Sequence, residues 1–210
     1  MDAFLSWLRG YGIGRGMETP EGLLIRTTDP AVEDLCRRYG DESFRHHRRQ
    51  IPRVNIHRPG IRYRRVLDQY EILVTGAGLP PLHEVRRVAA ACRDTEAHFW
   101  RGVTESCGTL CFRKKKKCPG LAFSHSAAQR IGQLRGMLDD AGWRTGPIAF
   151  SRAGNSWFDL ADADVPAFGE WIYREKGDIW SPARYERYRK GIRQMEKLKS
   201  PSAPALSTSL

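Results

Sequence analysis

Apolar residues along the chain recur in short runs, and their spacing changes repeatedly between the period of a helix and that of a strand. Between residues 126 and 141, apolar side chains recur at helical spacing, and Gly142 follows as a stop signal. Residues 21–28 are too few for a helix, and the second half of this segment is β-prone. The pattern therefore predicts short helices that alternate with strands.

Proline, glycine and capping residues set the expected boundaries. Asp29 and Pro30 have the order of a helix N-cap and first turn, and Gly40 ends that segment. Such signals predict helices over residues 2–11, 31–39, 82–92, 95–106, 126–141, 165–173 and 182–199. They predict strands over residues 21–28, 53–57, 61–74, 109–112, 121–124, 147–151 and 157–160.

Two segments, residues 8–16 and 100–108, share one pattern. Each has an Arg-Gly pair and a second glycine that lies six positions after the first. The order of elements after each segment is also alike, which indicates one αββαββα unit built twice. A glycine on a helix face lets another helix approach closely, so Gly10 and Gly102 favour two helices packed side by side. A flexible turn at residues 10–16, and chance similarity of the halves, are the competing interpretations.

The expected fold is thus α+β, with two pseudo-symmetric αββαββα halves. We place the halves at residues 1–94 and 95–199. Residues 200–210 are rich in Ser, Pro and Ala and are predicted to be a disordered tail.

Composition adds a partner class to this fold. The chain has 210 residues, of which 40% are hydrophobic and 28% charged, as expected for a folded core. Its net charge is +11, and arginine greatly outnumbers lysine. Arginine binds phosphate and guanine through planar, bidentate contacts, so a polyanion is the favoured partner, with an anionic membrane surface as the alternative.

Membrane insertion and a disulfide framework are both disfavoured. No run approaches the ~20 apolar residues that cross a bilayer, and the start of the chain is acidic at its tip and has too short an apolar stretch for a signal peptide. Five cysteines, an odd number, fit a reducing compartment. We expect a cytoplasmic protein that does not bind a membrane.

The two Arg-Gly segments are accompanied by three further segments, residues 137–143, residues 168–173 and Tyr188-Arg189-Lys190. Together they resemble the LAGLIDADG homing endonuclease family in its single-chain, two-motif form. The resemblance covers most of residues 2–195 and is clearer in the second half. It implies two motif helices packed at the centre and two sheets that form a saddle over the major groove of DNA.

In that family, an acidic residue just before the final glycine of each motif binds the divalent metal that supports phosphodiester hydrolysis. The resemblance places Arg15 and Cys107 at these positions. Arginine is itself a cation, and a thiolate is a soft ligand that suits Mg²⁺ poorly, so we expect no metal site. Glu105 and Glu18 are the alternative carboxylates, which an active, Mg²⁺-dependent endonuclease would have to recruit.

Basic residues are the candidates for nucleic-acid contact. Arg113 and the four lysines after it occupy the turn that follows the strand at 109–112, where phosphate would neutralise their charge, and a solvated loop is the alternative. Cations on or beside the strands are candidates for base contacts in a major groove, and surface solubility is the alternative for each one. The complete set is Arg26, His57, Arg62, Arg64, Arg113, Lys114, Lys115, Lys116, Lys117 and Arg152.

A zinc site is the remaining metal hypothesis. Its ligands would be Cys107, Cys111, Cys118 and His125, but their spacing lacks the paired Cys-x2-Cys knuckles of common zinc sites. Small core residues are the favoured interpretation of these cysteines. The chain also lacks a Walker loop and a dinucleotide-binding fingerprint.

The sequence therefore predicts a monomeric protein that binds double-stranded DNA at specific sites, without a cofactor and without nuclease activity. Two alternatives stay open. One is an active, metal-dependent DNA endonuclease, and the other is an RNA-binding, maturase-like splicing cofactor, an activity found among relatives of the family.

Overall fold

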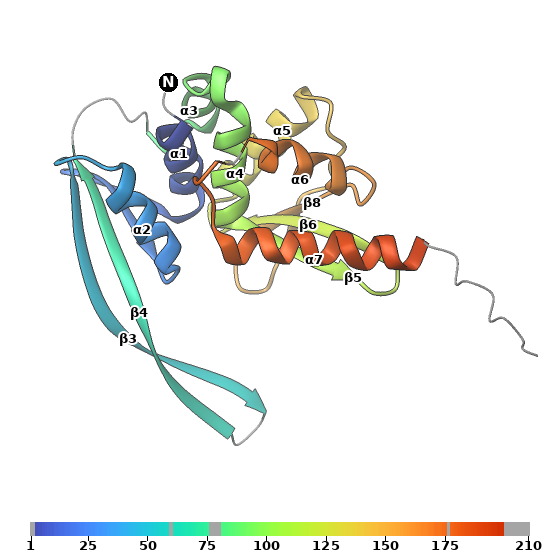
Figure 1. Cartoon of the computed structure of the whole chain (residues 1–210), viewed down its shortest axis with the longest axis horizontal. Helices are drawn as coiled ribbons and strands as arrows, with labels where there is room; N and C mark the ends of the chain where they lie inside the picture. Colours follow the sequence, from blue (N-terminus) through green and yellow to red (C-terminus); the bar gives the residue numbers. More distant parts are fainter. Residues whose placement is uncertain (1–2, 59–60, 76–80, 176, 200–210) are drawn as a thin grey trace, which may run out of the picture.

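The computed structural model describes residues 3–58, 61–75, 81–175 and 177–199, with the side chains of residues 53–65 and Lys199 left out of the description. Within these residues the chain forms two four-stranded antiparallel sheets, each covered by helices on one face (Figure 1). The sheets flank a central pair of helices, so the fold has two halves that meet at its middle.

The first half begins with a helix and adds two hairpins, each of which is followed by a helix. Its elements are α1 (Ala3–Arg15), β1 (Gly16–Thr19), β2 (Gly22–Thr27), α2 (Pro30–Tyr39), β3 (Phe44–Arg58), β4 (Ile61–Thr75) and α3 (Val85–Ala90). A short 3-10 helix, η1 (Arg93–Thr95), leads into the second half.

The second half repeats this order. Its elements are α4 (Glu96–Cys107), β5 (Gly108–Arg113), β6 (Cys118–His125), α5 (Ala128–Asp140), β7 (Ala149–Phe150), β8 (Ser156–Leu160) and α6 (Val165–Arg174), and α7 (Pro182–Lys199) follows. The strand orders are β1-β2-β4-β3 and β5-β6-β8-β7, so the two sheets have equivalent topology. The predicted α+β fold of two αββαββα units is confirmed.

Helices α1 and α4 pack side by side through their glycines (Figure 1). A Cβ atom at Gly10 would overlap the carbonyl oxygen of Phe99, and one at Gly102 would overlap the carbonyl oxygen of Trp7. Backbones this close leave room only for glycine at the contact. The two Arg-Gly segments therefore form the seam between the halves, as their shared pattern predicted.

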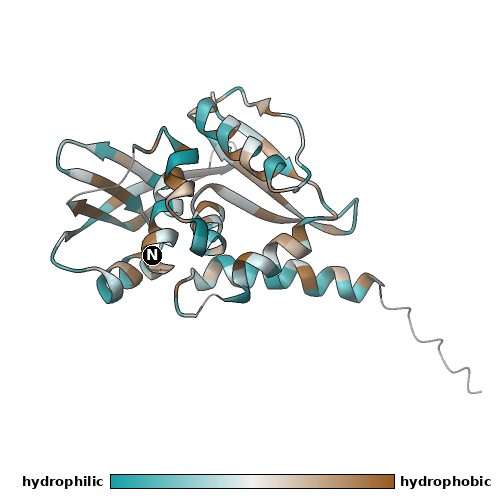
Figure 2. Cartoon of the chain, turned by 90° about the horizontal axis from the view of Figure 1, so that it is seen from above, coloured by the Kyte–Doolittle hydropathy of each residue, from teal (hydrophilic) through white to brown (hydrophobic). Residues whose placement is uncertain are grey.

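Each sheet turns alternate side chains toward the helices, because successive strand residues point to opposite faces. In the first sheet, Leu23 and Ile25 of β2 are buried opposite Val74 and Ile72 of β4. Arg26, the residue between the buried Ile25 and Thr27, lies on the other face of the sheet, which the helices leave open. In Figure 2, hydrophobic and hydrophilic residues interchange along strands and helices, as expected for elements with one buried side.

Helix α1 is longer than the pattern predicted. We expected it to end near residue 11, but it continues through Gly12 and Gly14 to Arg15. A Cβ at Gly12 would lie 3.2 Å from Leu23, and one at Gly14 would lie 2.9 Å from the Cβ of Cys107. Tertiary packing on both sides therefore stabilises a helix whose intrinsic propensity is poor.

The third strand is also longer than predicted. It was expected to begin at residue 53, but β3 begins at Phe44 and includes residues 45–48. The reason is a contact that the sequence does not reveal, because His46 faces helix α2 and its Nδ1 lies 3.0 Å from Oε2 of Glu33. Alternation along the strand then places Arg45 and His47 on the open face.

Strands β3 and β4 form a hairpin that extends far beyond the rest of the sheet (Figure 1). Only residues 70–75 of β4 also pair with β2, so the remainder is a two-stranded ribbon. Residues 44–67 contain eight arginines and no aspartate or glutamate. The ribbon therefore carries a high density of positive charge away from the core.

Helix α7 is added to the second half and docks against α6. A Cβ at Gly169 would overlap the ring of Tyr188, so this glycine receives the aromatic side chain. The hydroxyl of Tyr188 donates to the carbonyl oxygen of Pro166 at 2.9 Å, and its ring stacks on Tyr173 with centroids 5.6 Å apart. This docking brings the first turn of α7 close to the ends of the central helices.

Asp29 caps helix α2 and connects it to the start of α7. Its carboxylate accepts hydrogen bonds from the backbone nitrogen of Ala31 at 3.1 Å and from the Ser181 hydroxyl at 2.7 Å.

Asp29→Ala is expected to lower the free energy of unfolding, measured by urea denaturation, by about 1–2 kcal/mol. The control is Asp34→Ala, which removes an exposed carboxylate from the same helix and is expected to change stability by less than about 0.5 kcal/mol. Equal losses in the two variants would contradict the capping role.

Candidate functional site

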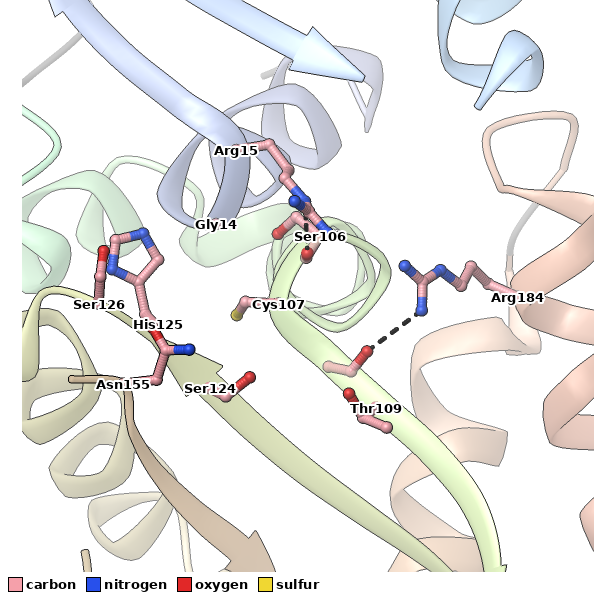
Figure 3. Close-up of a pocket in the computed structure, with 11 residues that line it drawn as sticks. Gly14, Arg15, Ser106, Cys107, Thr109, Ser124, His125, Ser126, Asn155 and Arg184 are labelled. Carbon is pink, nitrogen blue, oxygen red and sulfur yellow. Dashed lines mark hydrogen bonds between the residues drawn. The ribbon is translucent and has the colours of Figure 1, made fainter. Parts of the chain in front are cut away.

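The central helices end side by side at a polar pocket. Arg15 is the last residue of α1 and Cys107 is the last residue of α4, and both line a cavity of about 300 Å³ (Figure 3). The lining residues are Gly14, Arg15, Ser106, Cys107, Gly108, Thr109, Ser124, His125, Ser126, Asn155 and Arg184. None of them is a carboxylate, so the cavity has cations and hydroxyls where a metal site needs anionic oxygen ligands.

Three arginines cap the helix ends around this pocket. The Nε of Arg15 donates to the carbonyl oxygen of Ser106 at 3.1 Å, and Nη1 of Arg184 donates to that of Gly108 at 3.3 Å. Arg130 of α5 donates through Nη1 to the carbonyl oxygen of Ile13 at 3.0 Å. The last carbonyls of a helix lack partners within the helix and carry partial negative charge, so guanidinium groups stabilise both ends.

Cys107 is a buried thiol. Its Sγ donates to the carbonyl oxygen of Val103 at 3.3 Å, and burial raises its pKa to about 12. The side chain is therefore neutral near pH 7, and a neutral thiol is not a ligand for Mg²⁺. Neither Arg15 nor Cys107 therefore offers an anionic oxygen ligand at its helix end.

His125 completes the polar wall opposite the arginines (Figure 3). Its Nδ1 accepts a hydrogen bond from the backbone nitrogen of Ala127 at 2.8 Å, so the ring proton is on Nε2. Burial, and then the charges of Arg130 and Arg15, lower the pKa of His125. The ring is therefore neutral near pH 7 and keeps a hydrogen-bond donor.

Glu18, one of the two alternative metal ligands, lies in an adjoining cavity of about 510 Å³ that also contains Arg15 and Arg130. Its Oε1 accepts a hydrogen bond from the backbone nitrogen of Leu82 and lies 3.8 Å from Nδ1 of His83. The carboxylate thus bonds to the segment before α3 and does not line the pocket at the helix ends.

Glu105, the other alternative, is directed into the protein. Its side chain is fully buried, and both oxygens accept hydrogen bonds from Nε1 of Trp7, the hydroxyl of Tyr173 and the backbone nitrogen of Ser181, at 2.9–3.2 Å. Glu105 also borders a third cavity, of about 250 Å³, beside Asp29 and Arg184. Glu105 lies two positions before Cys107 in the helix, and its side chain points away from the pocket at the helix ends. Its hydrogen bonds connect α1, α6 and the start of α7.

The cations proposed from sequence have different surroundings. Arg26 lies on the open face of the first sheet, where its Nε is 2.8 Å from Oε1 of Glu71. Nη2 of Arg49, a residue not singled out from sequence, contacts the same oxygen at 3.0 Å. These two arginines share one carboxylate, so this face keeps a net positive charge.

The basic turn between β5 and β6 is partly neutralised within the protein. Arg113 contacts Asp159 at 2.6 Å and Asp162 at 3.1 Å, and Lys116 contacts Asp162 at 2.9 Å. Carboxylates of the neighbouring strand and of the turn after it therefore neutralise two of the five cations of this turn. In the part of the chain described, Lys114, Lys115 and Lys117 are exposed and form no ion pair.

Four further candidates lie on loops or on the ribbon. Arg152 is exposed in the loop between β7 and β8. The backbones of His57, Arg62 and Arg64 belong to β3 and β4, and their side chains lie outside the described residues. Register pairs Arg62 with Ile56 and Arg64 with Val54, which places both arginine backbones on the ribbon.

The zinc hypothesis finds no support in the geometry. Among the described residues, no group of three or more His, Cys, Asp or Glu side chains is arranged to hold a metal ion. Cys111 is exposed on the open face of β5, whereas Cys107 is buried at the end of α4. The two thiols therefore belong to different environments.

Arg130 and Arg184 were not predicted from sequence. Each lies in the first turn of its helix and far along the chain from the glycine motifs that it caps. The only available signal was an arginine near the start of a helix, which is too common to single out a site. Their role depends on how α5 and α7 dock.

No helix among the described residues is both long enough and apolar enough to span a membrane.

The paired glycine helices, the two equivalent sheets and the pocket at the helix ends define a single-chain protein of the LAGLIDADG class. A family model described as "Putative archaeal homing endonuclease", LAGLIDADG_4, matches residues 4–198. The chain belongs to this LAGLIDADG family. No curated protein matches the sequence.

Solved structures show the same fold at low sequence identity. Full-length DUF199/WhiA from Thermatoga maritima is similar with a TM-score of 0.57 and 14% identity, over 96% of this chain and 62% of that chain. A variant of I-DmoI in complex with its target DNA has a TM-score of 0.50 and 12% identity, over 84% and 97% of the two chains. I-DmoI in complex with DNA and Mn has a TM-score of 0.48 and 12% identity, over 81% and 96%.

Proposed function

We propose that this protein binds double-stranded DNA across the open faces of its two sheets and does not hydrolyse it. The observation that carries the proposal is the chemistry at the two helix ends. Arg15 and Cys107 stand where the family has its metal-binding acids, and the pocket that they share has no carboxylate in its lining. A divalent cation needs anionic oxygen ligands, and two-metal hydrolysis needs several that converge.

The charge distribution supports a nucleic acid as the partner. The net charge is +11, and the β3–β4 hairpin carries eight arginines without an acid between residues 44 and 67. Exposed lysines occupy the tip of the β5–β6 hairpin in the other half. Positive charge on both hairpins suits the two ends of one bound duplex, because phosphate contacts supply most of the affinity for DNA.

Duplex DNA is favoured over RNA by the fold itself. A two-stranded ribbon fits the major groove of B-form DNA, whereas the major groove of A-form RNA is too narrow for side chains to read. The I-DmoI variant that shares this fold was solved with its target DNA. Both sheets come from one chain, so we also propose that a monomer is sufficient for binding.

The test is a selection from random duplexes, followed by titration of the selected site at several salt concentrations. We expect specific binding without added metal, and a steep fall of affinity with salt, with a slope that corresponds to about 6–10 phosphate contacts. Lys114→Gln/Lys115→Gln/Lys117→Gln is expected to weaken binding and reduce that slope by about 2–3. The control replaces three exposed cations on the helix side, Arg37, Arg93 and Arg174, by glutamine and should leave the slope unchanged.

Cleavage is measured on a plasmid that carries the selected site, with Mg²⁺ or Mn²⁺. Specific double-strand breaks would contradict the proposal and favour an active endonuclease. Competition between the duplex and structured RNA at one ionic strength tests the partner, and stronger binding to RNA would favour a splicing cofactor instead.

A further inference from the structure

Among the residues that the structure describes, Arg15, Arg130 and Arg184 are cations without a carboxylate partner. Many of the other described arginines pair with acids, as Arg48 does with Asp68 at 2.8 Å. Within the described residues, no carboxylate oxygen lies within 4.0 Å of any of the three guanidinium groups around the helix ends. Two of them, on Arg15 and Arg184, line one cavity of about 300 Å³.

Each of these guanidinium groups has donors to spare. A guanidinium carries five N–H donors. The described contacts use Nε of Arg15, for Ser106, and Nη1 of Arg184, for Gly108. The helix-end carbonyls therefore fix the orientation of both groups, and the remaining donors are available to the cavity between them (Figure 3).

The opposite wall of the cavity adds neutral donors. His125 presents its Nε2 proton, and Ser124 and Ser126 present hydroxyls. Helix α5 begins just after this wall, and its N-cap residue, Ala127, has no side chain that could accept from the first-turn nitrogens. The positive end of this helix favours an anion nearby.

We propose that this cavity binds one backbone phosphate of the DNA directly, with the guanidinium groups of Arg15 and Arg184 in the place where the family holds divalent metal. Arg130, in the adjoining cavity, adds positive charge without a direct contact. The proposal rests on the function proposed above and adds the residues that hold the phosphate nearest to the helix ends. A phosphodiester is the only abundant anionic group of DNA, and bidentate guanidinium–phosphate pairs are strong and directional.

Guanidinium groups in the place of a metal ion would allow the DNA phosphate to be bound without being cleaved. A metal ion at this position neutralises the phosphate and also supplies a bound water of lowered pKa, which is the nucleophile. Guanidinium groups supply the charge and the orientation without generating hydroxide. Phosphate would thus be held at the centre of the duplex while the bond stays intact.

The experiment titrates the full chain with inorganic phosphate at constant ionic strength and follows the imidazole signals of His125 by NMR. We expect saturable changes at His125, with affinity at least tenfold weaker in Arg184→Gln. Arg184→Lys keeps the charge but not the planar guanidinium group, so its affinity for phosphate is expected to lie between those of the wild type and Arg184→Gln. Arg152→Gln, at an exposed loop cation, is the control and should bind phosphate as the wild type does.

Thermal melts verify that each variant is folded. Unchanged phosphate affinity in Arg184→Gln, or an equal loss in Arg152→Gln, would overturn the proposal. With DNA, Arg184→Gln is expected to reduce the salt slope by about 1. Wild-type binding to duplex without saturable phosphate binding at His125 would reject this site alone, whereas saturable phosphate binding without duplex binding would reject the proposed function.

Discussion

Gly102→Ala is expected to lower the free energy of unfolding by about 3 kcal/mol, at the upper end of what overpacking by a methyl group does. The new Cβ would overlap the carbonyl oxygen of Trp7 and lie 2.6 Å from the backbone nitrogen of Tyr11. Both obstacles are backbone atoms of α1, so no change of rotamer relieves them. The central helices would have to separate, which opens the buried seam between the halves.

Thermal and urea denaturation measure this effect, and a loss of about 3 kcal/mol corresponds to a melting temperature roughly 6–12 °C lower for a chain of this size. Gly132→Ala in α5 is the matched control, because a Cβ at Gly132 meets nothing within 4 Å. There the same change is expected to raise stability by about 0.5–1 kcal/mol, as alanine favours a helix more than glycine does. Changes of the same sign in both variants would contradict the close seam.

Glu105→Ala is expected to be at least as damaging, with a loss of about 3–5 kcal/mol. The substitution leaves three buried donors, on Trp7, Tyr173 and Ser181, without their acceptor. It also leaves a cavity where α1, α6 and the start of α7 meet. Glu170→Ala, at an exposed glutamate of α6, is the control and is expected to change stability by less than about 0.5 kcal/mol.

The ionisation of Glu105 gives this prediction a second readout. Burial raises its pKa from 4.5 to about 7, against the hydrogen bonds from Trp7 and Ser181, which lower it. Between these two pH values the folded state binds more protons than the unfolded state, so its stability falls as the pH rises through this window. The loss reaches a few kcal/mol by about pH 7–8.

Glu105→Gln removes this proton uptake, so its stability relative to the wild type is expected to increase from pH 5 to pH 8. Urea denaturation at pH 5, 6.5 and 8 measures the difference. An identical pH profile for the wild type and Glu105→Gln would show that the carboxyl group does not titrate in this range.

The fold was predictable to a large extent because its strongest signals are local. Asp29-Pro30 begins α2, and α7 has the boundaries that its sequence pattern indicated. The glycines at positions 10 and 102 predicted the seam, because close approach of two backbones requires the absence of a side chain. The length of α1 and the start of β3 were not predictable, because packing against Leu23 and the contact between His46 and Glu33 decide them.

The same difference between local signals and tertiary contacts applies to the candidate site. The sequence by itself determined that Arg15 and Cys107 occupy the two equivalent motif positions and that the chain carries a large positive charge. Only the tertiary structure decided that Glu105 is buried, that Asp162 neutralises part of the basic turn and that Arg184 reaches the helix ends. The physical reason is that periodicity and capping act over a few residues, whereas the partner of a charged side chain depends on elements that come together only when the chain folds.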